Sequence, residues 1–306
     1  MATVISAKII ADSVSESGKR ITTLQLCYPR IVHADFMTHR VFSRNGSSSR
    51  AMPIAKVIAQ VRNDPAMPVR WGKNQPGMQA HEDLTGTDLT LAQYRWRAAA
   101  HEAADSAESM MKLGLHKQIV NRILEPFQWM HVVLTATEFD NWDELRDHAD
   151  ADPTIQELAR QIKIARAGST PKLLSPGEWH LPYVTDEDYD AVARYRREAM
   201  GMNDLEAFDD DGIVEMLRKV SAARCCRVSY LKHDGHPSTI GDDLLLCERL
   251  AGARPIHASP FEHQATPDKL ENCPFVEGLL EWANPHLHGN FVGWVQYRKL
   301  IEQYFK

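Results

Sequence analysis

The chain has 306 residues, of which 43% are hydrophobic and 25% are charged, the usual balance of a globular protein. Its formal net charge of −6 argues against a general nucleic-acid coat, because phosphate contacts require a basic surface. No apolar run approaches the roughly 20 residues of a membrane span, and the N-terminus lacks a signal-peptide core. Five cysteines without any Cys-x-x-Cys spacing predict neither a disulfide framework nor a zinc site, so we expect a cytoplasmic protein.

The first part of the chain predicts a hairpin followed by mixed structure. Two β-rich runs, 4–11 and 21–28, are separated by a Ser/Gly turn and predict an antiparallel pair. A polar stretch at 38–50 and a helix that opens at Pro53 come next, and residues 63–86 look irregular. The elements expected after these are helix 88–113, helix 116–124, strand 129–136, helix 138–146 and helix 152–167.

The second part of the chain follows a connection rich in Pro and Gly at 168–186. Apolar spacing predicts that it is mainly helical, with helices at 186–200, 213–224, 242–250 and 291–304. We therefore expect an α+β fold with a mixed β-sheet flanked by helices. Residues 1–170, which include the polar stretch, and residues 171–306 are expected to form one intertwined catalytic domain.

The polar stretch from Thr38 to Arg50 concentrates three arginines, a histidine and four serines. Asn45-Gly46 predicts a turn in its middle. Guanidinium groups, hydroxyl groups and the free N–H groups of a tight turn together suit a phosphate or another planar anion. A solvated loop without a ligand explains the same composition equally well.

Three further stretches combine polar side chains that a core would not need. Arg122 ends a predicted helix and is either a second phosphate anchor or an ordinary surface cation. Arg146 leads out of a helix into an acidic turn, where a surface ion pair is the common explanation. His257, Glu262 and His263 could ligate a metal, but their spacing matches no zinc pattern, and we predict no metal site.

Taken together, these four stretches resemble the flavin-dependent thymidylate synthases. The family's Arg-His-Arg signature, with a serine after seven further residues, is similar to Thr38-His39-Arg40 followed by Ser48. Its His-x-(Ser/Thr)-Pro-Phe-Glu-His stretch is matched at 257–263, which is the most specific similarity. In the common family arrangement this second stretch comes first, so the motifs here stand in a permuted order.

The resemblance implies the fold of this family and a reductive one-carbon transfer. Methylenetetrahydrofolate would supply the carbon to C5 of a pyrimidine deoxynucleotide, with FAD as the redox carrier and NADPH as the usual reductant. The reaction implied first is the methylation of dUMP to dTMP. The family assembles as a homotetramer with sites shared between subunits, so we expect a homo-oligomer, without a membrane or nucleic-acid partner.

By position, the resemblance also implies roles for individual residues. Arg146 would be the catalytic residue, facing the pyrimidine ring and stabilising negative charge on it. The substrate-binding positions would be Asp35, Ser47, Ser48, Ser49, Arg50, Arg122 and Arg146. The positions in contact with FAD would be Thr38, His39, Arg40, Asn141, His257 and Ser259.

Two departures from the family pattern leave the substrate open. Thr38 stands where the family has an arginine, and Gly46 stands where it has a glutamate that touches nucleotide and flavin. Because a pocket with altered donors and acceptors can select another base, a dCMP methylase or a pyrimidine nucleotide hydroxymethylase is the first alternative. The second is a non-catalytic nucleotide- or nucleic-acid-binding protein that retains the fold.

Overall fold

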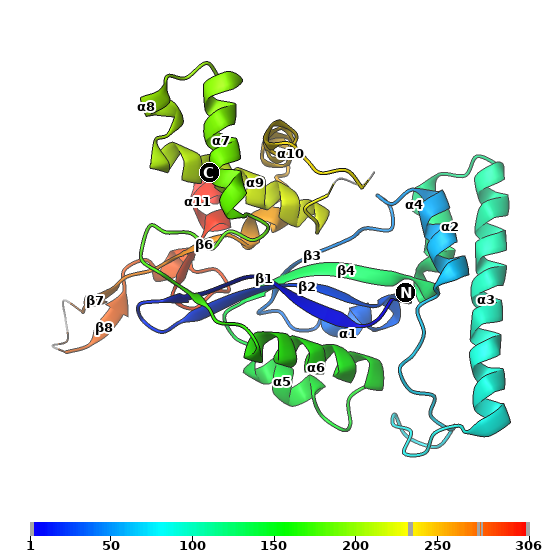
Figure 1. Ribbon diagram of the computed structural model, residues 1–306. Helices are drawn as coiled ribbons and strands as arrows, with labels where there is room; N and C mark the ends of the chain where they lie inside the picture. Colours follow the sequence, from blue (N-terminus) through cyan, green and yellow to red (C-terminus); the bar gives the residue numbers. More distant parts are fainter. Residues whose placement is uncertain (1–2, 232–234, 274–275, 277, 304–306) are drawn as a thin grey trace.

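A five-stranded sheet forms the centre of the molecule (Figure 1). The computed structural model describes residues 3–231, 235–273, 276 and 278–303. The strands of the sheet are β1 (Ser6–Ser15), β2 (Arg20–Pro29), β3 (Ser43–Gly46), β4 (Trp129–Ala136) and β5 (Lys172–Leu174). Their order is β3-β4-β2-β1-β5, with β1 and β5 parallel and the other neighbours antiparallel. The predicted α+β fold with a mixed sheet is therefore confirmed.

The helices group into three layers around this sheet. On one side lie η1 (Arg30–Val32), α1 (His33–Phe36), α5 (Asp140–Arg146) and α6 (Pro153–Ala167). At one end lie α2 (Ile54–Asn63), α3 (Gly86–Lys112), α4 (Lys117–Val120) and η2 (Asn121–Phe127). The C-terminal part adds α7 (Asp186–Glu198), α8 (Asp204–Ala207), α9 (Asp210–Arg227), α10 (Ile240–Gly252), η3 (Ser259–Glu262), η4 (Pro285–Leu287) and α11 (Tyr297–Gln303). It also contains two small pairs, β6 (Ala265–Pro267) with β9 (Trp294–Gln296) and β7 (Leu270–Asn272) with β8 (Leu280–Trp282).

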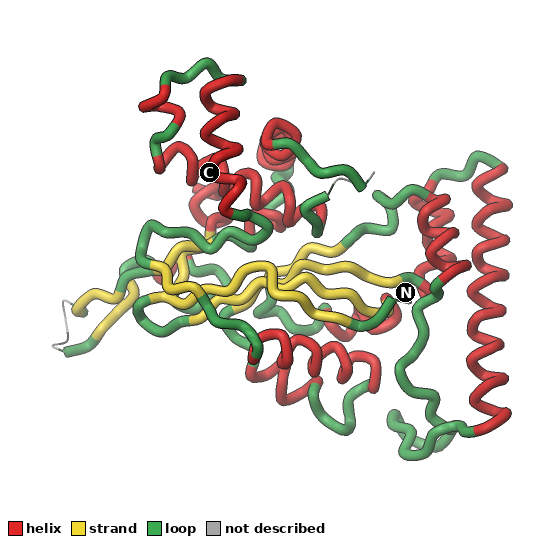
Figure 2. Tube along the Cα trace, in the orientation of Figure 1, coloured by secondary structure: helices red, strands yellow, loops and turns green. Residues whose placement is uncertain are grey.

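One face of the sheet packs against α5 and α6, which Figure 2 shows running beneath the strands. Side chains alternate along a strand, so Met130, Val132 and Leu134 of β4 point to this face. They form a buried core with Trp142 of α5 and Leu158 of α6. The helix N-terminus predicted near residue 152 is confirmed, because Asp152 accepts hydrogen bonds from the first backbone N–H groups of α6.

The opposite face packs against the C-terminal part through a chain of buried hydrogen bonds. Thr23 of β2 and Thr135 of β4 join their hydroxyl groups at 2.6 Å. Thr23 also bonds to His180 at 2.8 Å, and Thr135 bonds to His263 at 2.9 Å. Burial lowers the pKa of both histidines to about 3, so both imidazoles are neutral at pH 7. These hydrogen bonds therefore hold two loops of the C-terminal part against the sheet without burying a charge.

The helices at the end of the sheet form a layer with its own small core. Val61 of α2, Ala104 of α3 and Leu124 of η2 are fully buried in it. Because α3 contributes mainly alanines to this core, the 27-residue helix lies close to α2 and leaves most of its surface exposed. Within the described ranges, no helix is long and apolar enough to cross a membrane.

The predicted turn at Asn45-Gly46 is wrong, because both residues belong to β3. β3 pairs with the free edge of β4, and Asn45 stands opposite Val133. A side chain at Gly46 would meet the core, since its Cβ would lie 2.5 Å from Cε of Met130. The tertiary contact with β4 thus overrides the local preference of Asn-Gly for a turn.

Two predicted helices have different limits in the structure. The helix expected at 116–124 is α-helical only to Val120 and continues as the 3₁₀ helix η2, which contains Pro126. The helix expected at 291–304 begins only at Tyr297, because the residues just before it pair as β9 with β6. Its last residue, Tyr304, lies outside the described residues.

A buried ion-pair network holds α9 against α7 and α10. Arg224 donates to both carboxylate oxygens of Asp188, at 2.7 and 2.8 Å, and to Asp243 at 2.9 Å. Arg227 donates to the same Asp243. Burial opposes ionisation of Asp188, but the hydrogen bonds from Arg224 and from the Thr185 backbone outweigh it, so the pKa of Asp188 is lowered.

This network predicts a stability that depends on pH. Because the pKa of Asp188 is lower in the folded than in the unfolded chain, its ionised form stabilises the fold above about pH 4, and this contribution disappears as the pH falls through the folded pKa. We expect Asp188→Asn to lower the free energy of unfolding by about 3 kcal/mol at pH 7 and to flatten its acid dependence. Urea unfolding at several pH values measures both the free energy of unfolding and its dependence on pH. The exposed Asp190→Asn on the same helix is the control, and equal acid slopes for the two variants would contradict the assignment.

Candidate functional site

Arg146, Thr38 and His39 meet at the C-terminal end of α5, although 107 residues separate His39 from Arg146. Nε of Arg146 donates to Nε2 of His39 at 3.0 Å, and Nη2 donates to the Thr38 hydroxyl at 3.1 Å. Trp142, one turn earlier on α5, lies edge-on against the His39 ring, with ring centroids 4.8 Å apart. Two of the stretches singled out in the sequence therefore form one cluster.

The His39 side chain is a neutral hydrogen-bond acceptor. Burial, followed by the nearby charges of Arg146 and Arg44, lowers its pKa below the usual 6.5. Its Nε2 accepts a hydrogen bond from Nε of Arg146, so the ring proton lies on Nδ1. Arg44 donates to the His39 carbonyl and fixes the backbone at the same point. A neutral imidazole can thus orient Arg146 without neutralising its charge.

A cavity of about 480 Å³ lies beside Arg146. Asp35 of α1 and the connection between α5 and α6 line it on one side, and the segment 70–80 lines it on the other. The Gln79 amide donates to the Asp150 carbonyl at 3.2 Å and so ties this segment to the connection. The irregular region predicted between residues 63 and 86 therefore forms one wall of the space that Arg146 faces.

β3 divides the rest of the polar stretch between the two faces of the sheet. Ser43 and Asn45 stand opposite Thr135 and Val133 and point away from α5, whereas Arg44 points toward it. The pairing continues past β3, since the Ser47 N–H donates to the His131 carbonyl at 2.9 Å. The serines after β3 therefore lie on the opposite face of the sheet from Arg146.

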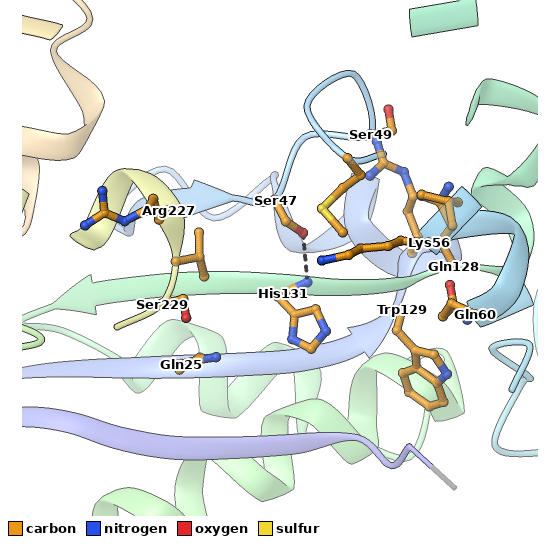
Figure 3. Close-up of a pocket in the computed structure, with 14 residues that line it drawn as sticks. Gln25, Ser47, Ser49, Lys56, Gln60, Gln128, Trp129, His131, Arg227 and Ser229 are labelled. Carbon is orange, nitrogen blue, oxygen red and sulfur yellow. Dashed lines mark hydrogen bonds between the residues drawn. The ribbon is translucent and has the colours of Figure 1, made fainter. Parts of the chain in front are cut away.

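On that opposite face, a cavity of about 330 Å³ lies over β2 and β4 (Figure 3). Figure 3 shows Ser47 and Ser49 on one side of it, Arg227 and Ser229 on the other, and Lys56 extending toward Ser47. Cationic and hydroxyl groups on a partly apolar lining suit a small anionic ligand with a polar body. The polar lining includes Arg30, Ser47, Ser49, Lys56, His131 and Arg227.

The chain is strained where α9 ends at this cavity. Val228 has a φ of 58°, a left-handed conformation that a β-branched residue rarely adopts. It is buried against Val133 and Tyr183, which hold it in place. Strain of this kind is concentrated at functional sites, because packing elsewhere has to maintain it. The turn brings Arg227 and Ser229 to the cavity wall.

Ser49 and Arg122, both predicted to bind phosphate, meet through Glu125. One carboxylate oxygen of Glu125 accepts from the Ser49 hydroxyl at 2.7 Å and from Nη1 of Arg122 at 2.9 Å. Arg30, which follows β2, lies 3.1 Å from the same oxygen. The two predicted groups are thus brought together, around a carboxylate of the protein itself.

The buried Asn121 fixes the segment after β3, residues 47–52, which we call the serine loop. Its amide donates to the carbonyl of Ser49 at 2.7 Å and to that of Met52 at 3.1 Å. Gln128 in turn donates to the Asn121 carbonyl, and the Gln128 carbonyl accepts from the Arg30 backbone. The loop, η2 and the end of β2 therefore form one rigid unit.

Most of the other predicted site residues lie on the surface. Ser259 reaches the polar stretch from the C-terminal part, because the Asn45 amide, oriented to satisfy both of its ends, donates to the Ser259 carbonyl at 3.3 Å. The two motifs that are far apart in the sequence thus touch. The exposed predicted positions are Asp35, Thr38, Arg40, Ser48, Arg50, Arg122, Asn141, His257 and Ser259.

The predicted FAD contacts lie around β3. Thr38 and His39 lie at the C-terminal end of α5, Asn141 belongs to the first turn of the same helix, and Ser259 lies against Asn45 on the other side. Hydroxyl, amide and imidazole groups at an open surface fit the phosphates and ring edges of a dinucleotide.

Several residues of the site were missed in the sequence. Glu125 follows Arg122 by three positions, a spacing typical of an ion pair on a helix, and that signal was available. His131 interrupts an otherwise apolar strand, which marks a side chain that leaves the core. Arg30, Lys56 and Asn121 carry no such signal, because only the fold brings them to the serine loop.

The cysteines carry no reactive thiol at this site. All five are unpaired, and only Cys226 is not buried. Burial raises the pKa of Cys27 to about 11 and that of Cys247 to about 12, so neither forms a thiolate at neutral pH. Among the residues that the structure describes, no three His, Cys, Asp or Glu side chains are placed to hold a metal ion.

Comparison with known proteins finds similar folds over about half of the chain. No protein-family model and no curated protein sequence matches it. One similar structure is a UMP/dUMP methylase, PolB, from Streptomyces cacaoi bound with 5-Br UMP, at 16% identity over 54% of this chain and 89% of that one, with a TM-score of 0.46. Another is the flavin-dependent thymidylate synthase ThyX from Helicobacter pylori with FAD and dUMP, at 14% identity over 48% and 67%, with a TM-score of 0.33. These structures include a member of the family that the motifs resemble.

The contact between Arg146 and His39 predicts a measurable coupling. Because Arg146 disfavours a charged imidazole, we expect Arg146→Gln to raise the pKa of His39, although burial keeps it below the usual value. NMR titration of the histidine ring signals measures this shift. Arg160→Gln, which removes a surface arginine paired with Asp147, is the control and should leave the pKa of His39 unchanged. An unchanged pKa in both variants would show that the two side chains do not meet in solution.

Proposed function

We propose that the protein transfers a one-carbon unit to C5 of a pyrimidine deoxynucleotide, in the manner of the flavin-dependent thymidylate synthases. The single observation that carries this proposal is the cluster of Arg146 with Thr38 and His39. It joins the residues that the resemblance assigns to substrate and flavin, from motifs 107 residues apart. The substrate proposed first is dUMP, and the product is dTMP.

Arg146 is proposed to activate the pyrimidine. Two of its nitrogens are held by the His39 ring and the Thr38 hydroxyl, so the guanidinium has a fixed orientation. Within the described residues its Nη1 has no hydrogen-bond partner, and the side chain lines the cavity beside Asp35. A guanidinium next to N3 and O4 of a uracil ring stabilises negative charge there and makes C5 more nucleophilic.

The proposed cofactor is FAD, with NADPH and methylenetetrahydrofolate as co-substrates. The bound flavin would supply the reducing equivalents of the methylation. Thr38, Arg40 and Asn141 would bind it from the side of α5, and Ser259 from the other side of β3. His39, neutral and buried, would contribute the orientation of Arg146 rather than a proton.

The proposed site is shared between copies of the chain. Arg146 and the serine loop lie on opposite faces of one sheet, so a nucleotide that contacts both would take them from different subunits. This agrees with the homotetramer that the resemblance implies. Both parts of the chain, 1–170 and 171–306, would contribute to each proposed site, because Arg227 and Ser229 line the same cavity as Ser47 and Ser49.

Arg146→Ala is expected to abolish turnover while the purified protein retains its flavin. The measurements are the visible absorption of the desalted protein and the mass of the product formed from dUMP or dCMP. The surface variant Arg160→Ala should keep both the flavin and the turnover of the wild type. Near-normal turnover in Arg146→Ala would remove the role given to this residue.

The other outcomes of this experiment separate the alternatives. A product from dCMP, or a product heavier by the mass of a hydroxymethyl group, would replace dUMP methylation by the related reactions. A folded wild type that retains no flavin and forms no product would support a non-catalytic nucleotide-binding protein.

The shared site predicts that two inactive variants complement each other. Arg50→Ala changes the exposed serine loop, and Arg146→Ala changes the opposite face, so mixed oligomers contain some sites with neither change. We expect turnover to return after the two variants are mixed under conditions that exchange subunits. If turnover does not return in oligomers shown to be mixed, both residues act within one subunit.

A further inference from the structure

Two hydrogen bonds and one ion pair converge on a single atom beside the serine-loop cavity, one carboxylate oxygen of Glu125. Ser49 and Arg30 line that cavity, and Arg122 reaches the same oxygen from η2. The Ser49 hydroxyl lies at 2.7 Å, Nη1 of Arg122 at 2.9 Å and Nη2 of Arg30 at 3.1 Å. Ser49 is buried, and the Glu125 side chain is 24% exposed. Two guanidinium groups and a hydroxyl group around one oxygen are the surroundings that a phosphate oxygen prefers. In this chain the Glu125 carboxylate occupies the position between the donors that a phosphate oxygen would prefer.

Two of the donors, Ser49 and Arg30, are held by contacts other than Glu125. Asn121 holds the carbonyls of Ser49 and Met52, so the loop remains in place without the carboxylate. The backbone of Arg30 is fixed by its hydrogen bond to Gln128, and its guanidinium also contacts Met130. Removing the charge of Glu125 should therefore leave Ser49 and Arg30 where they are.

We propose that Glu125 determines the specificity of this site by competing internally with the phosphate group of the substrate. This inference rests on the proposed function only in taking the serine loop as the place where the phosphate binds. When a phosphate binds, Glu125 has to give up one or more of its three donors, or share them with a second anion close by. Either event lowers affinity, because two like charges in contact repel each other.

The competition discriminates against ligands that offer a phosphate and nothing else. Inorganic phosphate or sulfate contacts only the three donors, so nothing else in its binding free energy offsets the displacement of the carboxylate. A nucleotide also has a sugar and a base, which can contact the other side of the same cavity, where Arg227 and Ser229 lie (Figure 3). Glu125 thus keeps the site open to nucleotides in a solution rich in free phosphate.

The test compares the binding of inorganic phosphate to the wild-type chain and to Glu125→Gln. The amide has the same shape, carries no charge and can donate to a phosphate oxygen. We expect phosphate to bind the variant at least tenfold more tightly, measured by isothermal titration calorimetry above the second pKa of phosphate. Deoxyuridine, which has no phosphate, should bind both proteins equally. Glu108→Gln is the matched control, because Glu108 also accepts from an arginine, Arg62, on the remote surface of α3.

A gain in affinity cannot result from a damaged fold, which makes this outcome decisive. Equal or weaker phosphate binding by Glu125→Gln would overturn the inference and make Glu125 a residue that positions the arginines. Failure of Glu125→Gln to bind phosphate would also overturn it. Turnover of dUMP by the wild type is measured separately. Tighter phosphate binding by Glu125→Gln without any wild-type turnover would retain the inference and reject the proposed function. Wild-type turnover without tighter phosphate binding by the variant would retain the proposed function and reject the inference.

Discussion

The pairing of β3 with the edge of β4 is the constraint on which both parts of the candidate site depend. A strand sends alternate side chains to opposite faces, so this pairing turns one polar stretch into two sets of groups. Arg44, on the side of α5, fixes the backbone of His39, and Ser43 and Asn45 face the C-terminal part. A shift of the register by one residue would exchange the two sets and dismantle both cavities. The close approach of Gly46 to Met130 and the pairing of Ser47 with β4 hold the register in place.

Charge is handled differently in the two halves of the molecule. In the C-terminal part, Arg224 is satisfied completely by Asp188, Asp243 and a carbonyl, which is what a structural arginine requires. Around the sheet, Arg146 is held by neutral partners and keeps its full charge. A cation oriented by an imidazole and a hydroxyl group can still attract an anion, whereas one paired with two carboxylates cannot. This difference separates residues that hold the fold from those that can act on a ligand.

The sequence predicted the helices and strands better than the contacts between them. Apolar periodicity was sufficient for the β1–β2 hairpin, for α6 with its Asp152 cap and for the buried strand β4, because each is specified by nearby residues. It failed at Asn45-Gly46, where a distant strand decides the conformation. For the site, the motifs located Arg146 and His39, but not that they touch, nor that Glu125 joins Ser49 to Arg122. Those contacts depend on the order of strands in the sheet, which local patterns do not encode.

Contacts on the sheet bring the stretch 257–263 to the polar stretch, although the two are far apart in the sequence. The stretch 257–263 reaches the sheet from the C-terminal part, yet its Ser259 meets Asn45 of β3, and its His263 meets Thr135 of β4. Contacts on the sheet, rather than position along the chain, therefore decide where this motif lies. A chain whose segments are reordered can keep a site when each segment docks on the same strands, because the docking surfaces are side chains of those strands. The buried chain of hydroxyl and imidazole groups from Thr23 to His263 provides such a surface here.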